Sequence, residues 1–206
     1  MALQDLRQAV QGEIFDYPML MHHLREYKKP RDKVTQLLKD KSIIRLKKGV
    51  YIFGPNYQRN LICLEILANV IYSPSYVSLE YALSKYGLIP ERAYAITSVS
   101  LKRSNTFKTD MGLFIYKVRT RSTYSIGINQ VEVLPHGRYL IAGKEKALVD
   151  LVSQAKDIQD VKEMQDYLYE NMRMEKSELR KLSQKLLYEI LESYKMSDIL
   201  IKAIYD

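Results

Sequence analysis

Apolar residues recur at helical spacing in three short segments near the N-terminus, over residues 2–10, 17–24 and 30–41. In the third segment Val34, Leu37 and Leu38 fall on one face, because positions three and four apart adjoin on a helix. Alternating apolar residues then predict two strands, 43–47 and 49–53. This order of three helices and a hairpin predicts a winged helix-turn-helix over residues 1–56.

Local signals support these helix and turn positions. Asp16 is a suitable N-cap for the second helix, and Pro30 suits the first turn of the third, where its missing N–H costs no hydrogen bond. Gly49 can take the positive φ angle that a tight turn between the two strands requires. Met19, Leu20 and Leu24 of the second helix are expected to face the core.

Gly54, Pro55 and Asn56 interrupt the pattern and predict a boundary between a domain at 1–56 and a domain at 57–206. The pattern beyond predicts a buried, nearly all-apolar helix at 60–71, a helix at 79–86 capped by Ser78, strands at 94–99, 111–118, 126–133 and 138–142, and a helix at 143–152. From residue 157 it is helical throughout. The expected fold class is therefore α+β: the winged helix, a mixed α/β core to about residue 155, and a helical C-terminal tail.

Basic residues concentrate on the third helix and the hairpin. Residues 25–48 hold ten basic and three acidic side chains, a local net charge of +7, in a chain whose formal net charge is +8. Such a charge favours an acidic partner, and the winged-helix order favours DNA. The predicted DNA-binding residues are Lys28, Lys29, Arg31, Lys33, Thr35, Gln36, Arg45, Lys47 and Lys48. An ordinary solvated Lys/Arg face is the alternative.

The charge of the remaining chain is uneven. Residues 92–128 hold seven basic side chains and one acidic side chain, a net charge of +6, whereas residues 157–206 hold eight basic and eleven acidic ones, a net charge of −3. A possible antitoxicity or polyanion-facing surface comprises Lys102, Arg103, Lys108, Arg119 and Arg121. A merely solvated strand face is the alternative for these residues.

The candidate chemistry argues against an enzyme, a metal site or a cofactor. The chain has no P-loop and no Gly-rich dinucleotide fingerprint. A nuclease needs clustered carboxylates for its metal, but Asp110 is isolated among basic residues, and Glu145 and Asp150 are expected on a capped, solvated helix. Cys63, the single cysteine, lacks an evident partner base and is expected to be a small core residue.

The same inventory predicts a cytoplasmic protein with no membrane partner. One cysteine leaves no disulfide framework within the chain, which suits a reducing compartment. No apolar run reaches the roughly 18 residues of a membrane-spanning helix.

Three motifs carry a resemblance to a known family. They are Lys48-Gly49-Val50-Tyr51 in the hairpin, the segment 76–90 with the sequence YVSLEYALSKYGLIP, and Glu145-Lys146-Ala147-Leu148-Val149-Asp150. In this order and spacing, over roughly residues 5–155, the chain resembles the AbiEi-type antitoxins of type IV toxin–antitoxin systems, which are called abortive-infection systems when they act against phage. Tyr86 stands where many of those antitoxins have histidine.

The resemblance implies a function in two parts. The winged helix would bind operator DNA and repress its own operon, and the remainder would counteract a cognate nucleotidyltransferase toxin, whose catalytic acids would lie on that partner chain. A stand-alone winged-helix regulator with a C-terminal sensing domain is the alternative. The resemblance leaves open the operator sequence, the target of the toxin, and whether inhibition needs direct contact with it.

Overall fold

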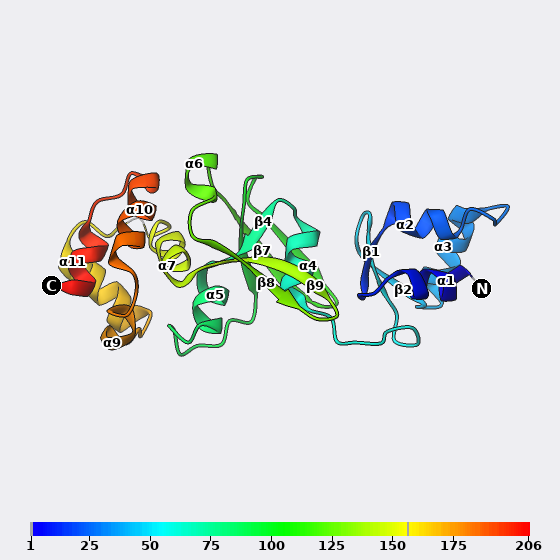
Figure 1. Cartoon of the computed structure of the whole chain (residues 1–206), viewed down its shortest axis with the longest axis horizontal. Helices are drawn as coiled ribbons and strands as arrows, with labels where there is room; N and C mark the ends of the chain where they lie inside the picture. Colours follow the sequence, from blue (N-terminus) through cyan, green and yellow to red (C-terminus); the bar gives the residue numbers. More distant parts are fainter. Residues whose placement is uncertain (1, 156) are drawn as a thin grey trace. The chain divides into compact units, whose positions relative to one another are not determined.

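The computed structural model describes residues 2–155 and 157–206 and is a mixed α+β structure with two sheets (Figure 1). The chain divides into two compact units. The N-terminal unit comprises Met1–Ile71 and Glu132–Arg138, and the C-terminal unit comprises Tyr72–Val131 and Tyr139–Asp206. The boundary predicted after residue 56 thus falls within the N-terminal unit, and the division into domains at 1–56 and 57–206 stays a prediction.

The N-terminal unit contains the predicted helices and hairpin. Its elements are α1 (Ala2–Ala9), β1 (Ile14–Asp16), α2 (Tyr17–His23), α3 (Pro30–Lys39), β2 (Ile43–Lys47), β3 (Val50–Phe53) and α4 (Leu64–Ile71). The strands form an antiparallel sheet in the order β1-β3-β2. The three-residue strand β1 was not predicted, because so short a segment carries no alternating pattern.

The local signals in this unit act as expected. The Asp16 carboxylate accepts a hydrogen bond from the Met19 amide at 2.8 Å and so caps α2. Gly49 has a φ angle of +87° in the hairpin turn. Leu20 and Leu24 join the core with the apolar face of α3, but Met19 is 42% exposed, so the prediction that it faces the core is wrong.

The N-terminal unit also contains a buried ion pair. The Arg7 guanidinium donates to the Glu13 carboxylate at 2.9 Å, and both side chains are buried. Arg7 also donates to the carbonyl oxygens of Val10 and Gly12, each at 2.9 Å. Glu13 in turn accepts a hydrogen bond at 3.0 Å from the amide of Asn60. The pair therefore joins the end of α1 to the segment that follows the hairpin.

Helix α4 is shorter than the helix predicted at 60–71. Leu61 precedes it and is largely exposed, and Val70 is exposed on its surface. The prediction of burial on every side is therefore wrong for these two residues. Cys63 is half-buried just before α4, with Sγ at 3.3 Å from a carboxylate oxygen of Glu65, and burial raises the pKa of its thiol.

The larger sheet has six strands in the order β6-β7-β5-β4-β9-β8. Their bounds are β4 Ser75–Val77, β5 Ile96–Ser100, β6 Asn105–Thr109, β7 Gly112–Val118, β8 Ile128–Val133 and β9 Gly137–Ala142. The central strands run in mixed directions: β4 pairs antiparallel with β5 and parallel with β9, and β5 pairs parallel with β7. Four of these strands match predicted segments, whereas β4 and β6 were missed.

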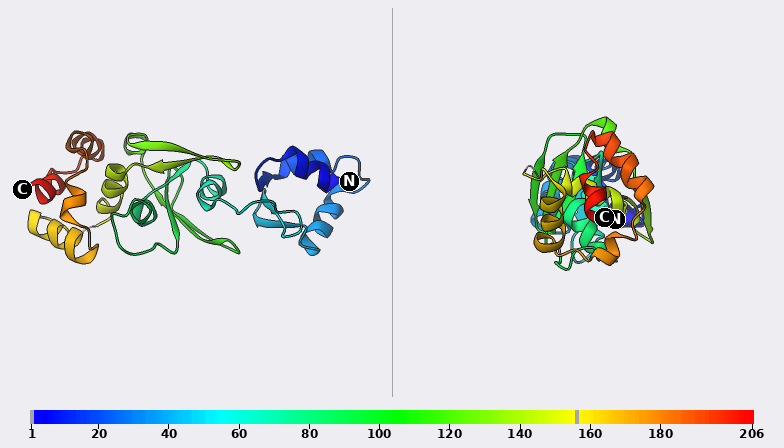
Figure 2. Two further views of the ribbon diagram at one scale, coloured as in Figure 1. Left: turned by 60° about the horizontal axis from the view of Figure 1, so that its bottom comes forward. Right: turned by 90° about the vertical axis from the view of Figure 1, so that its left-hand side faces the viewer.

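The C-terminal unit also contains a series of helices. They are α5 (Leu79–Lys85), α6 (Arg121–Tyr124), α7 (Lys144–Val152), α8 (Val161–Gln165), the π-helix η1 (Asp166–Asn171), α9 (Lys176–Leu179), α10 (Gln184–Tyr194) and α11 (Ile199–Tyr205). Helix α7 lies between the sheet and the C-terminal helices, and it packs against α5 and α10 (Figures 1 and 2). Every residue of α7 from Lys146 to Val152 is consequently buried.

None of the described helices combines the length and apolar character needed to cross a membrane.

Candidate functional site

The exposed side of α3 carries most of the predicted DNA-binding residues. Arg31, Thr35 and Gln36 are exposed, whereas Val34 and Leu37 are buried on the opposite side. The fold thus separates a polar face of α3 from the apolar face that packs in the core. Lys28 and Lys29 are exposed in the turn before α3, Arg45 is exposed on β2, and Lys48 is exposed at the hairpin turn. We call these exposed polar and basic residues, together with Lys33 and Lys47, the basic face.

Hydrogen bonds organise part of the basic face. The Lys33 ammonium donates to Gln36 Oε1 at 3.1 Å and lies 5.6 Å from the centre of the Tyr27 ring. The Thr35 hydroxyl donates to the Arg31 carbonyl one helical turn back, at 3.2 Å. The first bond links two side chains one turn apart, and the second fixes the Thr35 hydroxyl to the helix backbone.

Lys47 and Lys48 differ, although they are adjacent in the sequence. Lys48 is exposed, whereas Lys47 is half-buried and its ammonium donates to the carbonyl oxygen of Ile71 in the same unit. Of the two, Lys48 is the side chain that points to solvent from the hairpin.

The five basic residues predicted for the antitoxicity or polyanion-facing surface also differ in their exposure to solvent. Lys102, Arg103, Lys108 and Arg121 are exposed in the C-terminal unit, and Lys102 lies 5.4 Å from the centre of the Tyr72 ring. Arg119 is different, because its side chain is only 16% exposed and reaches an ionic cluster in the interior. The four exposed residues therefore form a solvated set that excludes Arg119.

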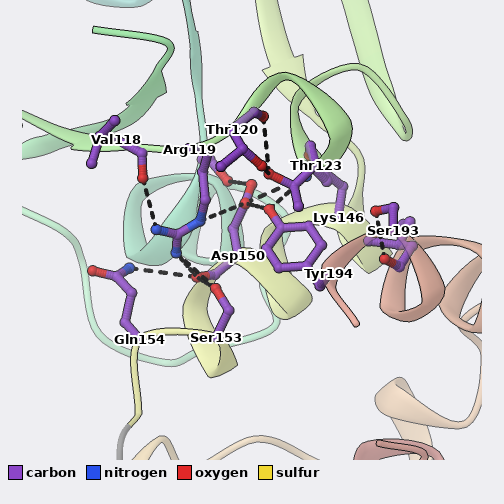
Figure 3. Close-up of polar contacts among 12 residues, drawn as sticks. Val118, Arg119, Thr120, Thr123, Lys146, Asp150, Ser153, Gln154, Ser193 and Tyr194 are labelled. Atoms are coloured by element: carbon purple, nitrogen blue, oxygen red, sulfur yellow. Dashed lines mark hydrogen bonds and ion pairs between the residues drawn. The ribbon is translucent and has the colours of Figure 1, made fainter. Parts of the chain in front are cut away.

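Asp150 on α7 lies at the centre of this interior cluster (Figure 3). One carboxylate oxygen accepts hydrogen bonds from the Ser78 hydroxyl at 2.7 Å and from the Tyr76 hydroxyl at 3.0 Å. The other accepts from the Tyr194 hydroxyl and lies 3.5 Å from the Lys146 ammonium and 3.8 Å from Arg119 Nε. We call Arg119, Lys146 and Asp150, with Tyr76, Ser78 and Tyr194, the buried charge cluster.

Lys146 is completely buried, one helical turn before Asp150. Its ammonium donates to the Tyr194 hydroxyl at 2.7 Å and to the Thr123 carbonyl. Burial lowers the pKa of Lys146, and the Asp150 carboxylate opposes that shift. Gly127 is needed beside it, because a Cβ at Gly127 would lie 2.9 Å from the Cβ of Lys146.

The hydroxyl groups of the cluster serve as donors. Burial, followed by the nearby Asp150 carboxylate, raises the pKa of both Tyr76 and Tyr194. Both phenols therefore remain protonated and donate to Asp150. Ser78 stands at the N-cap position of α5 as predicted, but its hydroxyl caps no helix amide and bonds to Asp150 instead.

The expectation that Asp150 lies on a solvated helix face is wrong, because Asp150 and Lys146 are both fully buried. The cluster draws on β4, on the segment after β7, and on α7 and α10, which lie far apart in the sequence. One signal for it was present: Lys146 and Asp150 are four residues apart, a spacing that pairs opposite charges on a helix.

An open groove of about 590 Å³ adjoins the cluster. It is lined by Val118, Arg119, Thr120, Thr123, Val152, Ser153, Ala155, Tyr194 and Met196, all within the C-terminal unit. We call it the Arg119 groove.

No group of three or more His, Cys, Asp or Glu side chains within residues 2–155 and 157–206 is arranged to hold a metal ion. No protein-family model matches the chain, and no curated protein sequence matches it.

Proposed function

We propose that this chain is an antitoxin of a type IV toxin–antitoxin system, which binds operator DNA through an N-terminal winged helix and counteracts a nucleotidyltransferase toxin. The observation that carries the DNA-binding part is the basic face, in which both α3 and the hairpin that follows it carry exposed polar or basic side chains. The antitoxin part rests on the resemblance of the three motifs to AbiEi-type antitoxins.

The arrangement of the N-terminal unit supports the winged-helix proposal. Helices α1, α2 and α3 share one core, and the β2–β3 hairpin follows α3 directly in a three-stranded antiparallel sheet. In winged-helix proteins the third helix enters the major groove of DNA. In the proposed complex, Arg31, Thr35 and Gln36 of α3 read base edges.

The lysines around α3 have a different proposed role. Lys28 and Lys29 precede the helix, and Lys48 lies at the hairpin turn, so they are suited to phosphate oxygens rather than to base edges. Phosphate contacts supply affinity without sequence preference and make binding depend on salt.

The DNA-binding proposal predicts distinct effects for Gln36→Ala and Lys48→Ala. Gln36→Ala is expected to reduce the preference for DNA upstream of the chain's own gene over random DNA by about 1–3 kcal/mol, the value of one bidentate base contact. Lys48→Ala is expected to weaken binding to both DNAs alike and to lower the salt slope by about one charge. Fluorescence anisotropy at several salt concentrations measures both effects.

Lys185→Ala is the matched control for these variants, because Lys185 is an exposed lysine on α10, in the C-terminal unit. It should leave affinity and salt slope unchanged. Equal losses on both DNAs for Gln36→Ala would assign Gln36 a positioning role, and wild-type binding by both α3 and hairpin variants would contradict the winged-helix proposal.

For the antitoxin part, we predict that charge reversal at Lys102, Arg103 and Lys108 abolishes protection against the toxin while DNA binding is retained. These exposed side chains present positive charge to a polyanion or to an acidic partner surface. The measurement is survival of cells that express the neighbouring nucleotidyltransferase gene together with each variant.

Charge reversal at Lys162, Lys176 and Lys185, three exposed lysines of the C-terminal helices, controls for the change in net charge. Protection lost equally in both triple variants would show a general effect of charge. Full protection by the Lys102, Arg103 and Lys108 variant would move the proposed antitoxicity surface to the acidic helical tail.

A second candidate, a stand-alone regulator that senses a small effector, is favoured by one observation, the Arg119 groove. A cavity of about 590 Å³ is within the size range of small-molecule sites. The genomic neighbourhood separates the two candidates, since only the antitoxin requires a nucleotidyltransferase gene beside it.

A further inference from the structure

The Arg119 groove combines apolar walls with a few convergent polar groups. Val118, Val152 and Met196 contribute apolar surface, while the Arg119 guanidinium and the Ser153 and Tyr194 hydroxyls contribute polar groups. A small number of fixed polar groups in a largely apolar cavity is typical of small-molecule sites. No acidic side chain lines this groove among the residues that the structure describes.

Arg119 is held in one orientation by its own hydrogen bonds. One terminal nitrogen donates to the Val118 carbonyl at 3.0 Å, and the other donates to the Asp150 carbonyl at 3.0 Å and to Ser153 Oγ at 2.7 Å. These bonds use three of the five N–H groups of a guanidinium. The side chain is thus preorganised and does not need to lose rotamer freedom when a ligand binds.

The guanidinium of Arg119 also keeps a buried donor without an acceptor in the described part of the chain. This donor is Nε, which makes no hydrogen bond and lies 3.8 Å from the nearest oxygen of Asp150. Asp150 itself is fully occupied by the hydroxyls of Tyr76, Ser78 and Tyr194 and by Lys146. Nε is buried, so a ligand in the groove cannot reach it. The donor left for a ligand is the second N–H of the terminal nitrogen that donates to Val118.

The charges of the cluster are also unequal. Arg119 and Lys146 share Asp150 as the one carboxylate within ion-pair distance of either cation among the described residues. A partly buried cation without a full counter-charge favours an anion beside it. An anion in the groove can reach Arg119, because its side chain lines the groove and is partly exposed. It cannot reach Lys146, which is fully buried.

We infer that the Arg119 groove binds a small organic oxyanion, with its carboxylate or phosphate group on Arg119 and its apolar or aromatic body against Val118, Val152 and Met196. The positive charge of the guanidinium favours either oxyanion, and its remaining terminal N–H can donate to one of the oxygens. The volume of about 590 Å³ exceeds what an inorganic ion fills and accommodates a body the size of a nucleoside or a substituted benzene ring. This inference does not depend on the proposed antitoxin function.

Calorimetric titration of the full chain tests the inference with four probes. AMP and benzoate each carry an anionic group attached to an aromatic compound. Inorganic phosphate is the anionic group alone, and adenosine is the aromatic compound without the anionic group. We expect one saturable site for AMP or for benzoate, with an affinity at least about tenfold above that for phosphate and adenosine. The better of the two full probes identifies the oxyanion as phosphate or carboxylate.

Three variants locate the site. Arg119→Gln removes the cation, and Ala155→Phe adds bulk at a residue that lines the groove and does not belong to the buried charge cluster. Each is expected to weaken binding of the better probe by about tenfold or more. Arg121→Gln, at an exposed arginine two residues from Arg119, is the matched control and should bind as the wild type does. Circular dichroism verifies folding, and Ala155→Phe decides the result if Arg119→Gln unfolds.

Three results would overturn the inference. One is the absence of saturable binding by both AMP and benzoate up to about 10 mM. Another is unchanged binding in folded Ala155→Phe. The third is equal weakening by Arg119→Gln and Arg121→Gln, which would indicate attraction to general positive charge. Because the titration contains neither DNA nor toxin, its outcome is separate from that of the proposed function.

Discussion

Asp150→Ala is expected to destabilise the C-terminal unit by about 3–5 kcal/mol, the cost of removing one partner from a buried ionic network. The substitution leaves the fully buried Lys146 ammonium without its carboxylate and also removes the acceptor for Tyr76 and Ser78. Each buried hydroxyl that loses its acceptor adds a further penalty of about 1–3 kcal/mol. The whole C-terminal unit is expected to respond, because the cluster joins β4 to α7 and α10.

Urea denaturation followed by circular dichroism measures this loss. Hydrogen exchange at the amides of α7 localises it, with the amides of α1 to α3 as an internal reference. Glu189→Ala is the matched control, since Glu189 is an exposed carboxylate on α10, and it should change stability by less than about 0.5 kcal/mol.

Lys146→Met provides a graded comparison. It removes one cation and leaves Arg119 and the three hydroxyls near Asp150, so it is expected to cost less than Asp150→Ala. Stability changes below about 1 kcal/mol for both variants would contradict the view that the carboxylate organises this interior.

Arg7→Met is expected to destabilise the N-terminal unit by about 3–5 kcal/mol, because it leaves the Glu13 carboxylate buried without its cation. Methionine retains much of the apolar stem, so the loss reports on the ion pair and on the hydrogen bonds from Arg7 to Val10 and Gly12. The Arg7 guanidinium also lies 4.2 Å from the centre of the Phe53 ring, a contact that the methionine side chain partly replaces with apolar packing.

Hydrogen exchange at the amides of α1 and β3 measures this effect in the full chain. Gln8→Met, at the adjacent exposed position of α1, is the control for introducing methionine. The double variant Arg7→Met, Glu13→Gln should recover part of the loss, since a neutral amide costs less to bury than an unpaired carboxylate. A double variant less stable than Arg7→Met alone would show that the remaining bonds of Glu13 to the Asn60 region dominate.

The sequence by itself determined most of the local structure of the first 53 residues, apart from strand β1 and the exposure of Met19. Its signals act over a few residues: Asp16 bonds to an amide three positions away, Pro30 begins α3, and Gly49 takes the positive φ of the hairpin turn. The spacing of Val34 and Leu37 also fixed which side of α3 is buried. Hence the polar face of α3 could be predicted, since a helix with one apolar side leaves only one side for solvent.

Only the tertiary structure decided the environment of individual charged residues. Lys47 and Lys48 look equivalent in the sequence, but only Lys47 reaches the carbonyl of Ile71. Arg119 belongs to a basic stretch of the sequence, and it contacts Asp150 on α7 only because the folded sheet places the end of β7 next to that helix. Strands β4 and β6 escaped prediction because their own patterns are weak: β4 has three residues, and β6 (NTFKT) holds a single apolar residue. Pairing makes them strands, since β4 pairs with β5 and β9, and β6 pairs with the adjacent β7.

Lys146 and Asp150 show most clearly the difference between what the sequence indicates and what the tertiary structure decides. Their spacing of four residues is readable in the sequence and is one that places two side chains on one side of a helix, but no pair was predicted from it. Charged residues usually mark the solvated side, so Asp150 was expected to be exposed. In the fold, α7 is covered by α5 and α10, which leaves it no solvated side, and hydroxyls from Tyr76, Ser78 and Tyr194 replace water around the carboxylate. Burial of a helix depends on what packs over it, and the partners of Asp150 come from segments up to 74 residues away in the chain.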